Sequence, residues 1–287
     1  SINSGKVIGP RIISCGMPIT ITGGHCYYLG IETDGVYEIR KTVRNLIKQG
    51  ADFIKVMVTG GGSTPQTDKK TTYFSNGELF ALVDESHRFN KKVAAHVHGT
   101  EGVLQSAIAG VDTIEHSSFL TDKGMKVENN IIECIKKNSI SIVPTISGTI
   151  CLDYEGPFYL NSFNLSNIDR RAFFNARFQL FKDFLKSGVN ILAGNDAGVT
   201  GTPHDGFIYE LEMMAELGMK KEDVIKAATI KASTALGLKD EIGTIEKGKI
   251  ADLLVLNGNP LEDIHTLRNP YMVITKGIII NGKKCVL

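Results

Sequence analysis

Short apolar runs rich in β-branched residues alternate with longer amphipathic stretches over most of this chain, and this alternation limits the possible folds more than any other feature. Strand followed by helix, repeated along a chain, is typical of a parallel sheet. The apolar runs are mostly continuous, as expected when helices cover the sheet or the sheet closes on itself. About six such units can be counted. The expected strands are residues 11–15, 52–59, 92–98, 112–116, 139–145 and 190–193.

The same patterning predicts helices after these strands, several of them ending at a glycine such as Gly50 or Gly110. The expected helices are residues 37–49, 78–89, 101–109, 127–137, 168–186, 207–217 and 221–236. A TIM-type (β/α)8 barrel contains eight strand–helix units in about 250 residues. A doubly wound sheet is the alternative, but no Gly-x-Gly-x-x-Gly follows an expected strand, which argues against a dinucleotide site. We therefore predict an α/β protein with about six units of a TIM-type barrel in residues 1–240.

The pattern changes after Gly237. Residues 241–287 lack a helical period and contain turn sequences, such as Asn257-Gly258 and Asn281-Gly282, between short apolar runs. Such a segment is too short to bury a core of its own. We interpret it as the C-terminal portion of a small β-sandwich that packs against another part of the protein.

Charge and cysteine content exclude several classes of protein. The formal net charge of the 287 residues is +1, which argues against nucleic acid or an acidic membrane surface as a partner. No apolar run approaches the roughly 18 residues of a membrane-spanning helix. The five cysteines are scattered, without a Cys-x-x-Cys pair, as is typical of a reducing compartment. These features predict a cytoplasmic protein, and they leave homo-oligomerisation open.

Residues with catalytic chemistry occur where the expected strands end. They are Lys55, His96, His98, His116 and Asp196. The active sites of parallel barrels lie at the C-terminal ends of the strands. Neutral imidazole and carboxylate are the ligands that zinc-like divalent ions prefer. His96 and His98 are two residues apart on one strand, so both should point to the same face, and either could bind a metal.

Each of these residues taken alone also has a structural explanation. Lys55 could extend its ammonium to the rim of the barrel, and Asp196 could be an ordinary turn residue. His87, His204 and His265 are assigned to such structural roles. However, Lys55 lies within an apolar run, where an unpaired buried ammonium would be costly. The occurrence of all five groups at equivalent strand ends therefore favours a metal site.

Five segments at these positions resemble the amidohydrolase superfamily, as does a segment at the start of the tail. The branch that the chain resembles most is the Xaa-Pro dipeptidase and imidazolonepropionase-like group, whose early Gly-Gly-His is matched by Gly23-Gly24-His25. The resemblance extends over essentially the whole chain. The matching segments are residues 53–61, 95–99, 114–117, 143–145, 194–198 and 243–253.

The resemblance implies a role for each candidate residue. Lys55 would be carbamylated and bridge two divalent metal ions, with zinc the expected metal at one or two positions. His96 and His116 would bind one ion, whereas Asp196 would bind the other and act as the catalytic general base. His25 and His98 would line the substrate pocket.

The function implied is hydrolysis of a peptide or amide bond in a dipeptide or N-acyl amino acid, by attack of a metal-bound hydroxide. The alternatives are a cyclic-amide hydrolase of the imidazolonepropionase type and an inactive partial barrel. The family's first barrel strand carries a His-x-His pair, and no such pair precedes Arg11. The sequence therefore predicts about 100 further N-terminal residues that supply two strands, the pair and the rest of the sandwich.

Overall fold

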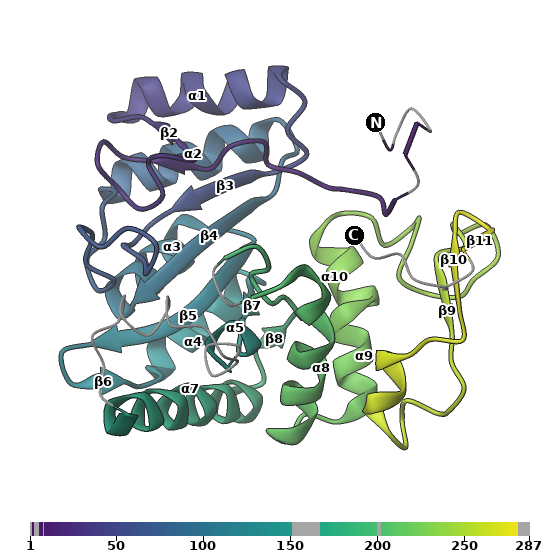
Figure 1. The fold of residues 1–287 in the computed structure, drawn as a ribbon. Helices are drawn as coiled ribbons and strands as arrows, with labels where there is room; N and C mark the ends of the chain where they lie inside the picture. The colour runs from purple at the N-terminus through teal and green to yellow at the C-terminus, as the bar shows by residue number, and fades with distance from the viewer. Residues whose placement is uncertain (1, 3–5, 8, 151–166, 200–201, 281–287) are drawn as a thin grey trace.

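The computed structural model describes residues 2, 6–7, 9–150, 167–199 and 202–280. Its main sheet is mostly parallel, with the strand order β2-β1-β3-β4-β5-β7-β8, and β6 pairs antiparallel with β5 (Figure 1). This arrangement confirms the predicted α/β fold of a TIM-type barrel. The strands of this sheet are β1 Ile19–Thr20, β2 Ile31–Glu32, β3 Ile54–Met57, β4 Val93–Gly99, β5 Thr113–Thr121, β6 Gly124–Met125, β7 Ser141–Val143 and β8 Asn190–Ile191.

Helices follow most of the strands, and α1 and α7 flank the sheet at opposite ends of the view in Figure 1. In the described part of the chain, two short 3-10 helices, η2 and η3, lie within the C-terminal third. Among the described residues, no helix has both the length and the apolar composition needed to cross a membrane. The bounds are α1 Val36–Lys48, α2 Asn76–Arg88, α3 Thr100–Ala109, α4 Asn129–Lys137, α5 Ser147–Ile150, α7 Asn167–Ser187, η2 His204–Gly206, α8 Phe207–Glu216, α9 Lys221–Ala228, α10 Ile230–Ala235 and η3 Ile264–Arg268.

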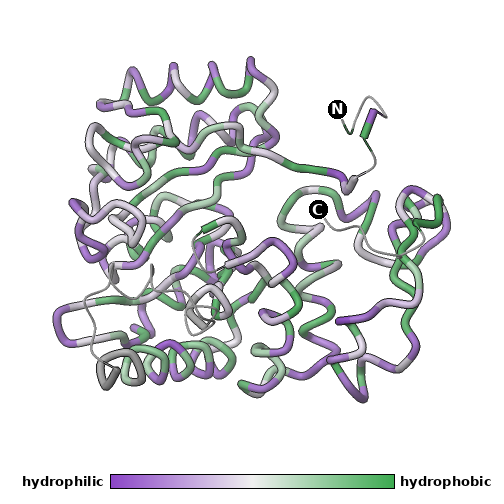
Figure 2. Tube along the Cα trace, in the orientation of Figure 1, coloured by the Kyte–Doolittle hydropathy of each residue, from purple (hydrophilic) through white to green (hydrophobic). Residues whose placement is uncertain are grey.

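The hydrophobic core lies between the sheet and its helices. On β3, Ile54 and Val56 are fully buried in this core, whereas Lys55 and Met57 alternate with them and face the opposite side of the sheet. Hydrophobic and hydrophilic residues alternate along α1, as expected for a helix with one buried face (Figure 2). Alternation within the strands therefore assigns one face of the sheet to the core and leaves the other for polar side chains.

Two sequence expectations differ from the structure. Residues 11–15 form no strand but a partly exposed segment, and the fully buried Ile19 and Thr20 of β1 pair with β2 and β3 instead. The expected helix 221–236 is divided at Thr229 into α9 and α10, where φ is −126° and ψ is −98°. The Thr229 hydroxyl donates to the Ile225 carbonyl at 2.7 Å, a side-chain bond that commonly bends helices.

The C-terminal segment forms a small antiparallel sheet in the order β11-β10-β9, which confirms the predicted β module. Its strands are β9 Leu253–Val255, β10 Met272–Thr275 and β11 Ile278–Ile280, and residues 281–287 lie outside the described part of the chain. The connection between β9 and β10 contains η3, whose side chains form hydrogen bonds with a residue of α8. Glu212 of α8 is buried and accepts from Arg268 at 2.5 Å and from His265 at 2.9 Å. His265 therefore has the structural role assigned to it.

Candidate metal centre

Two histidines of β4 point to the same face of the sheet, as their spacing predicts. The ring centroids of His96 and His98 are 4.8 Å apart with the rings nearly perpendicular. His96 is 6% exposed and His98 is partly buried. Regular strand geometry is sufficient to place both rings at the C-terminal end of β4.

His116 joins this pair through an irregular backbone. It follows Glu115 on β5, so strict alternation would turn its side chain away from the face that Glu115 occupies. The structure instead has φ values of +66° at His116 and +44° at Ser117, in the left-handed region that residues other than glycine seldom adopt. The His116 ring centroid consequently lies 4.7 Å from those of both His96 and His98. Unfavourable backbone conformations of this kind cluster at functional sites.

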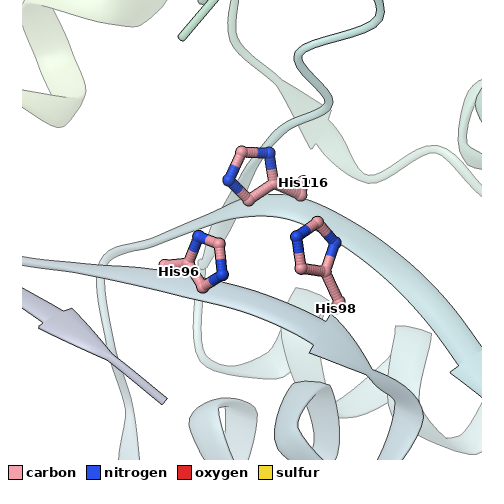
Figure 3. A group of neighbouring side chains, drawn as sticks. All are labelled: His96, His98 and His116. Carbon is pink, nitrogen blue, oxygen red and sulfur yellow. The ribbon is translucent and has the colours of Figure 1, made fainter. Parts of the chain in front are cut away.

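The three histidines form a compact group, and each offers a ring nitrogen to it (Figure 3). These nitrogens all lie within 4.8 Å of one another. Burial lowers the pKa of all three rings well below the usual histidine value, and neighbouring positive charges lower them further. Neutral imidazole is the form that binds metal, so this donor set fits a divalent ion of the zinc type.

His25 lies beside the group. Its ring stacks on that of His96 with the centroids 4.5 Å apart, and only 4% of the residue is exposed. Burial first, and then the charges of Lys69 and Lys55, lower the pKa of His25 to about 4. Gly61 leaves room for the ring, because a Cβ there would lie 2.3 Å from Nε2 of His25. The loop between β1 and β2 thus brings a fourth imidazole to the site.

Lys55 is paired with an acidic residue, Glu115, that was not among the residues predicted from the sequence. Its ammonium donates to Glu115 Oε2 at 2.7 Å, and the side chains of Lys55 and Glu115 are 19% and 17% exposed. The hydroxyl of Thr113 donates to the other carboxylate oxygen of Glu115 at 2.6 Å. The ion pair removes the cost of an unpaired buried ammonium. Glu115 could have been found from alternation, since it lies on the same face of its strand as Lys55 does.

Asp196 occupies the turn that follows β8, and its φ of +55° is again left-handed. Although the residue is exposed, surrounding protein atoms partly desolvate the carboxylate and raise its pKa, an effect that the positive charge of Lys55 opposes. Asp196 is not a member of the three-histidine group. The structure therefore gathers His25, His96, His98 and His116 by direct ring contact, whereas Asp196 and Lys55 interact electrostatically beside them.

Arg177 of α7 was also not among the site residues predicted from the sequence. It is 6% exposed and donates to the backbone carbonyl of His116 at 3.1 Å and to Ser118 Oγ at 2.9 Å. Its position four residues before the buried Phe181 places it on the apolar face of the helix, which was the only signal available in the sequence.

The sequence matches the Amidohydrolase family over residues 2–284. The chain therefore belongs to this family, as its strand-end motifs predicted. It is 30% identical over 301 residues to the ochratoxinase of Aspergillus niger, and this alignment covers 95% of the chain and 60% of the relative. The chain thus spans less than two thirds of the length of that protein.

Two solved structures are similar over nearly the whole chain. A Xaa-Pro dipeptidase with methionine bound in its active site has a TM-score of 0.84 and 32% identity, with 98% of this chain and 70% of that chain covered. A prolidase complexed with N-methylphosphonate-L-proline has a TM-score of 0.83 and 25% identity, with 98% and 71% covered.

Proposed function

We propose that this chain provides the metal-dependent active site of a hydrolase that cleaves the amide bond of a dipeptide or N-acyl amino acid. The observation that carries the proposal is the compact, largely buried group of His96, His98 and His116, whose ring nitrogens lie within 4.8 Å of one another, with Lys55 and Asp196 nearby. The relatives support the substrate class. Ochratoxinase, a Xaa-Pro dipeptidase and a prolidase are among the proteins to which the chain is similar.

In this proposal His96, His116, Asp196 and a carbamylated Lys55 would hold one or two divalent ions, with zinc favoured by the nitrogen and oxygen donors. Such an ion polarises the scissile carbonyl and lowers the pKa of water. Carbamylation converts the Lys55 cation into an anion beside Glu115. The two negative charges would repel each other, so the modification is stable only when a cation is bound nearby.

Asp196 is proposed as the general base. Its carboxylate accepts the proton of the attacking water and returns a proton to the leaving amine as the amide bond breaks. Desolvation raises the pKa of Asp196, which brings the carboxyl closer to the range where both transfers are efficient. His25 and His98 line the pocket around the bond that is cleaved.

Lys69 supplies a positive charge for the substrate's carboxylate. The backbone next to Lys69 packs closely against Gly60 and Gly99, which follow or end strands β3 and β4. A Cβ at Gly60 would lie 2.4 Å from the Asp68 carbonyl oxygen, and a Cβ at Gly99 would lie 2.3 Å from the Lys70 carbonyl oxygen. Burial lowers the pKa of Lys69 to about 8, so its ammonium remains mostly protonated at neutral pH. Its charge also lowers the pKa values of His98 and His116.

Lys69→Met is expected to raise KM about ten- to a hundredfold for substrates with a free carboxylate, the effect of losing one hydrogen bond to a charged group. For substrates whose carboxylate is capped as an amide, Lys69→Met should leave KM unchanged relative to the wild type. The matched control is Lys70→Met, because the Lys70 ammonium is bonded to Asp122 at 2.5 Å at the surface. Equal effects of the two substitutions in steady-state kinetics would contradict a carboxylate contact by Lys69.

Metal dependence is tested by removing and restoring the ion. Purified protein treated with a chelator should lose hydrolysis of dipeptides and N-acyl amino acids, measured as the release of free amine, and added zinc should restore it. Hydrolysis that survives complete removal of metal would reject the proposed function. Failure of any divalent ion to support cleavage of either substrate class would reject it equally.

A further inference from the structure

We infer that Arg177 and Ser118 fix His98 as a hydrogen-bond donor to the substrate, so that His98 is not a third metal ligand. The inference rests on the proposed function for the identity of the bound substrate. The arrangement of hydrogen bonds on which it depends is independent of that function. The first residue of this arrangement is Arg177, which is buried and bonded to the backbone of His116 and to Ser118.

Arg177 can only donate hydrogen bonds, because a guanidinium has no acceptor. Its Nη1 lies 2.9 Å from Ser118 Oγ and 3.1 Å from the His116 carbonyl oxygen, and its Nη2 donates to the Pro144 carbonyl oxygen. The Ser118 oxygen is therefore an acceptor toward Arg177. Its own hydroxyl hydrogen must find a partner in another direction.

That partner is His98. Ser118 is 2% exposed, and a buried hydroxyl hydrogen without an acceptor costs about 1–3 kcal/mol. His98 Nδ1 lies 2.8 Å from Ser118 Oγ, the geometry of a hydrogen bond. Nδ1 of His98 therefore accepts from Ser118. A neutral imidazole whose Nδ1 accepts carries its hydrogen on Nε2, and this N–H is the group that His98 turns toward the site.

His96 has the opposite arrangement. Its Nε2 lies 3.2 Å from the Gly60 carbonyl oxygen, which can only accept, so Nε2 carries the hydrogen and Nδ1 keeps its lone pair. Metal-binding histidines typically donate their second ring nitrogen to a carbonyl or carboxylate in this way. His96 thus offers a lone pair to a metal, whereas His98 offers a hydrogen.

Arg177 is consequently a positioning residue. Through Ser118 it orients the His98 ring and selects the tautomer that donates toward the carbonyl oxygen of the scissile amide. Through the carbonyls of His116 and Pro144 it also holds the two turns that carry His116 and Thr145, both of which have positive φ values. Its role is the same whichever divalent ion is bound.

The first test measures the tautomer directly in the full chain labelled with 15N-histidine. The signals of His98 are identified by their loss in His98→Gln, and the wild-type spectrum should show hydrogen on Nε2 and none on Nδ1. Ser118→Ala should convert His98 to a mixture of both tautomers. The matched control is Ser117→Ala, since the neighbouring Ser117 hydroxyl is buried without a hydrogen-bond partner in the described structure. A hydrogen on Nδ1 of His98 in the wild type would overturn the inference.

The second test is a zinc titration of the same variants. His98→Gln should leave the zinc Kd within about tenfold of wild type, whereas His96→Gln should weaken it by more than about 100-fold. Equal losses for the two variants would make His98 a ligand and reject the inference. Neither readout depends on catalysis. Absence of amide hydrolysis would therefore reject the proposed function while the tautomer and zinc results still decide the role of His98.

Discussion

His96→Gln is expected to remove metal binding and, with it, more than about 99% of any hydrolytic activity. Changing the outer partners of a metal ligand typically costs 10- to 100-fold in affinity or activity, and the ligand itself should matter more than its partners. Glutamine keeps the size and polarity of the side chain and can still donate to Gly60, which Nε2 of His96 contacts at 3.2 Å. Loss of activity in this variant would therefore be due to the absence of the metal-binding ring nitrogen.

The measurement pairs zinc stoichiometry with amine release, and the control is His87→Gln. His87 is also a strand-flanking histidine, but it lies on α2 and pairs with Asp112 at 2.8 Å near the opposite ends of the strands. His87→Gln should bind metal and turn over as the wild type does. A His96→Gln variant with normal zinc content and turnover would remove His96 from the metal site.

Glu210→Ala is expected to lower the free energy of unfolding by about 2–5 kcal/mol. The carboxylate is fully buried and accepts from the backbone N–H groups of Ile146 at 3.0 Å and Ser147 at 2.6 Å. Each buried N–H left without a partner costs about 1–3 kcal/mol. Glu210 also interacts electrostatically with Arg177, so the substitution removes a negative charge that stabilises this buried cation.

Urea unfolding followed by circular dichroism measures this effect. The control is Glu216→Ala on the same helix, an exposed glutamate that should change stability by less than about 0.5 kcal/mol. If both variants unfold at the same urea concentration, Glu210 does not support the segment that follows β7. Glu210→Gln, which keeps one carbonyl acceptor, should fall between wild type and Glu210→Ala.

Much of the candidate site could be found from the sequence because it depends on local geometry. A strand has a side-chain period of two, so His96 and His98 had to share a face wherever β4 lay in the fold. Parallel strands also end at a common edge, so His96, His116 and Asp196 were expected to lie at one site. The same local rule failed for residues 11–15, whose apolar residues are typical of a strand. In the described structure the Ser14 backbone bonds to Asp52, which precedes β3, and no continuous ladder of backbone hydrogen bonds forms.

The sequence by itself therefore determined the α/β architecture, the family and the strand ends that carry the histidines, since periodicity and motifs are properties of neighbouring residues. Only the tertiary structure decided how those histidines meet. His116 reaches His96 and His98 because left-handed backbone turns it there, and Arg177 holds that turn from a helix 61 residues away along the chain. Lys55 likewise pairs with Glu115, which is 60 residues away along the chain. Alternation gives the face on which each side chain lies, but which side chains then meet depends on packing between distant segments.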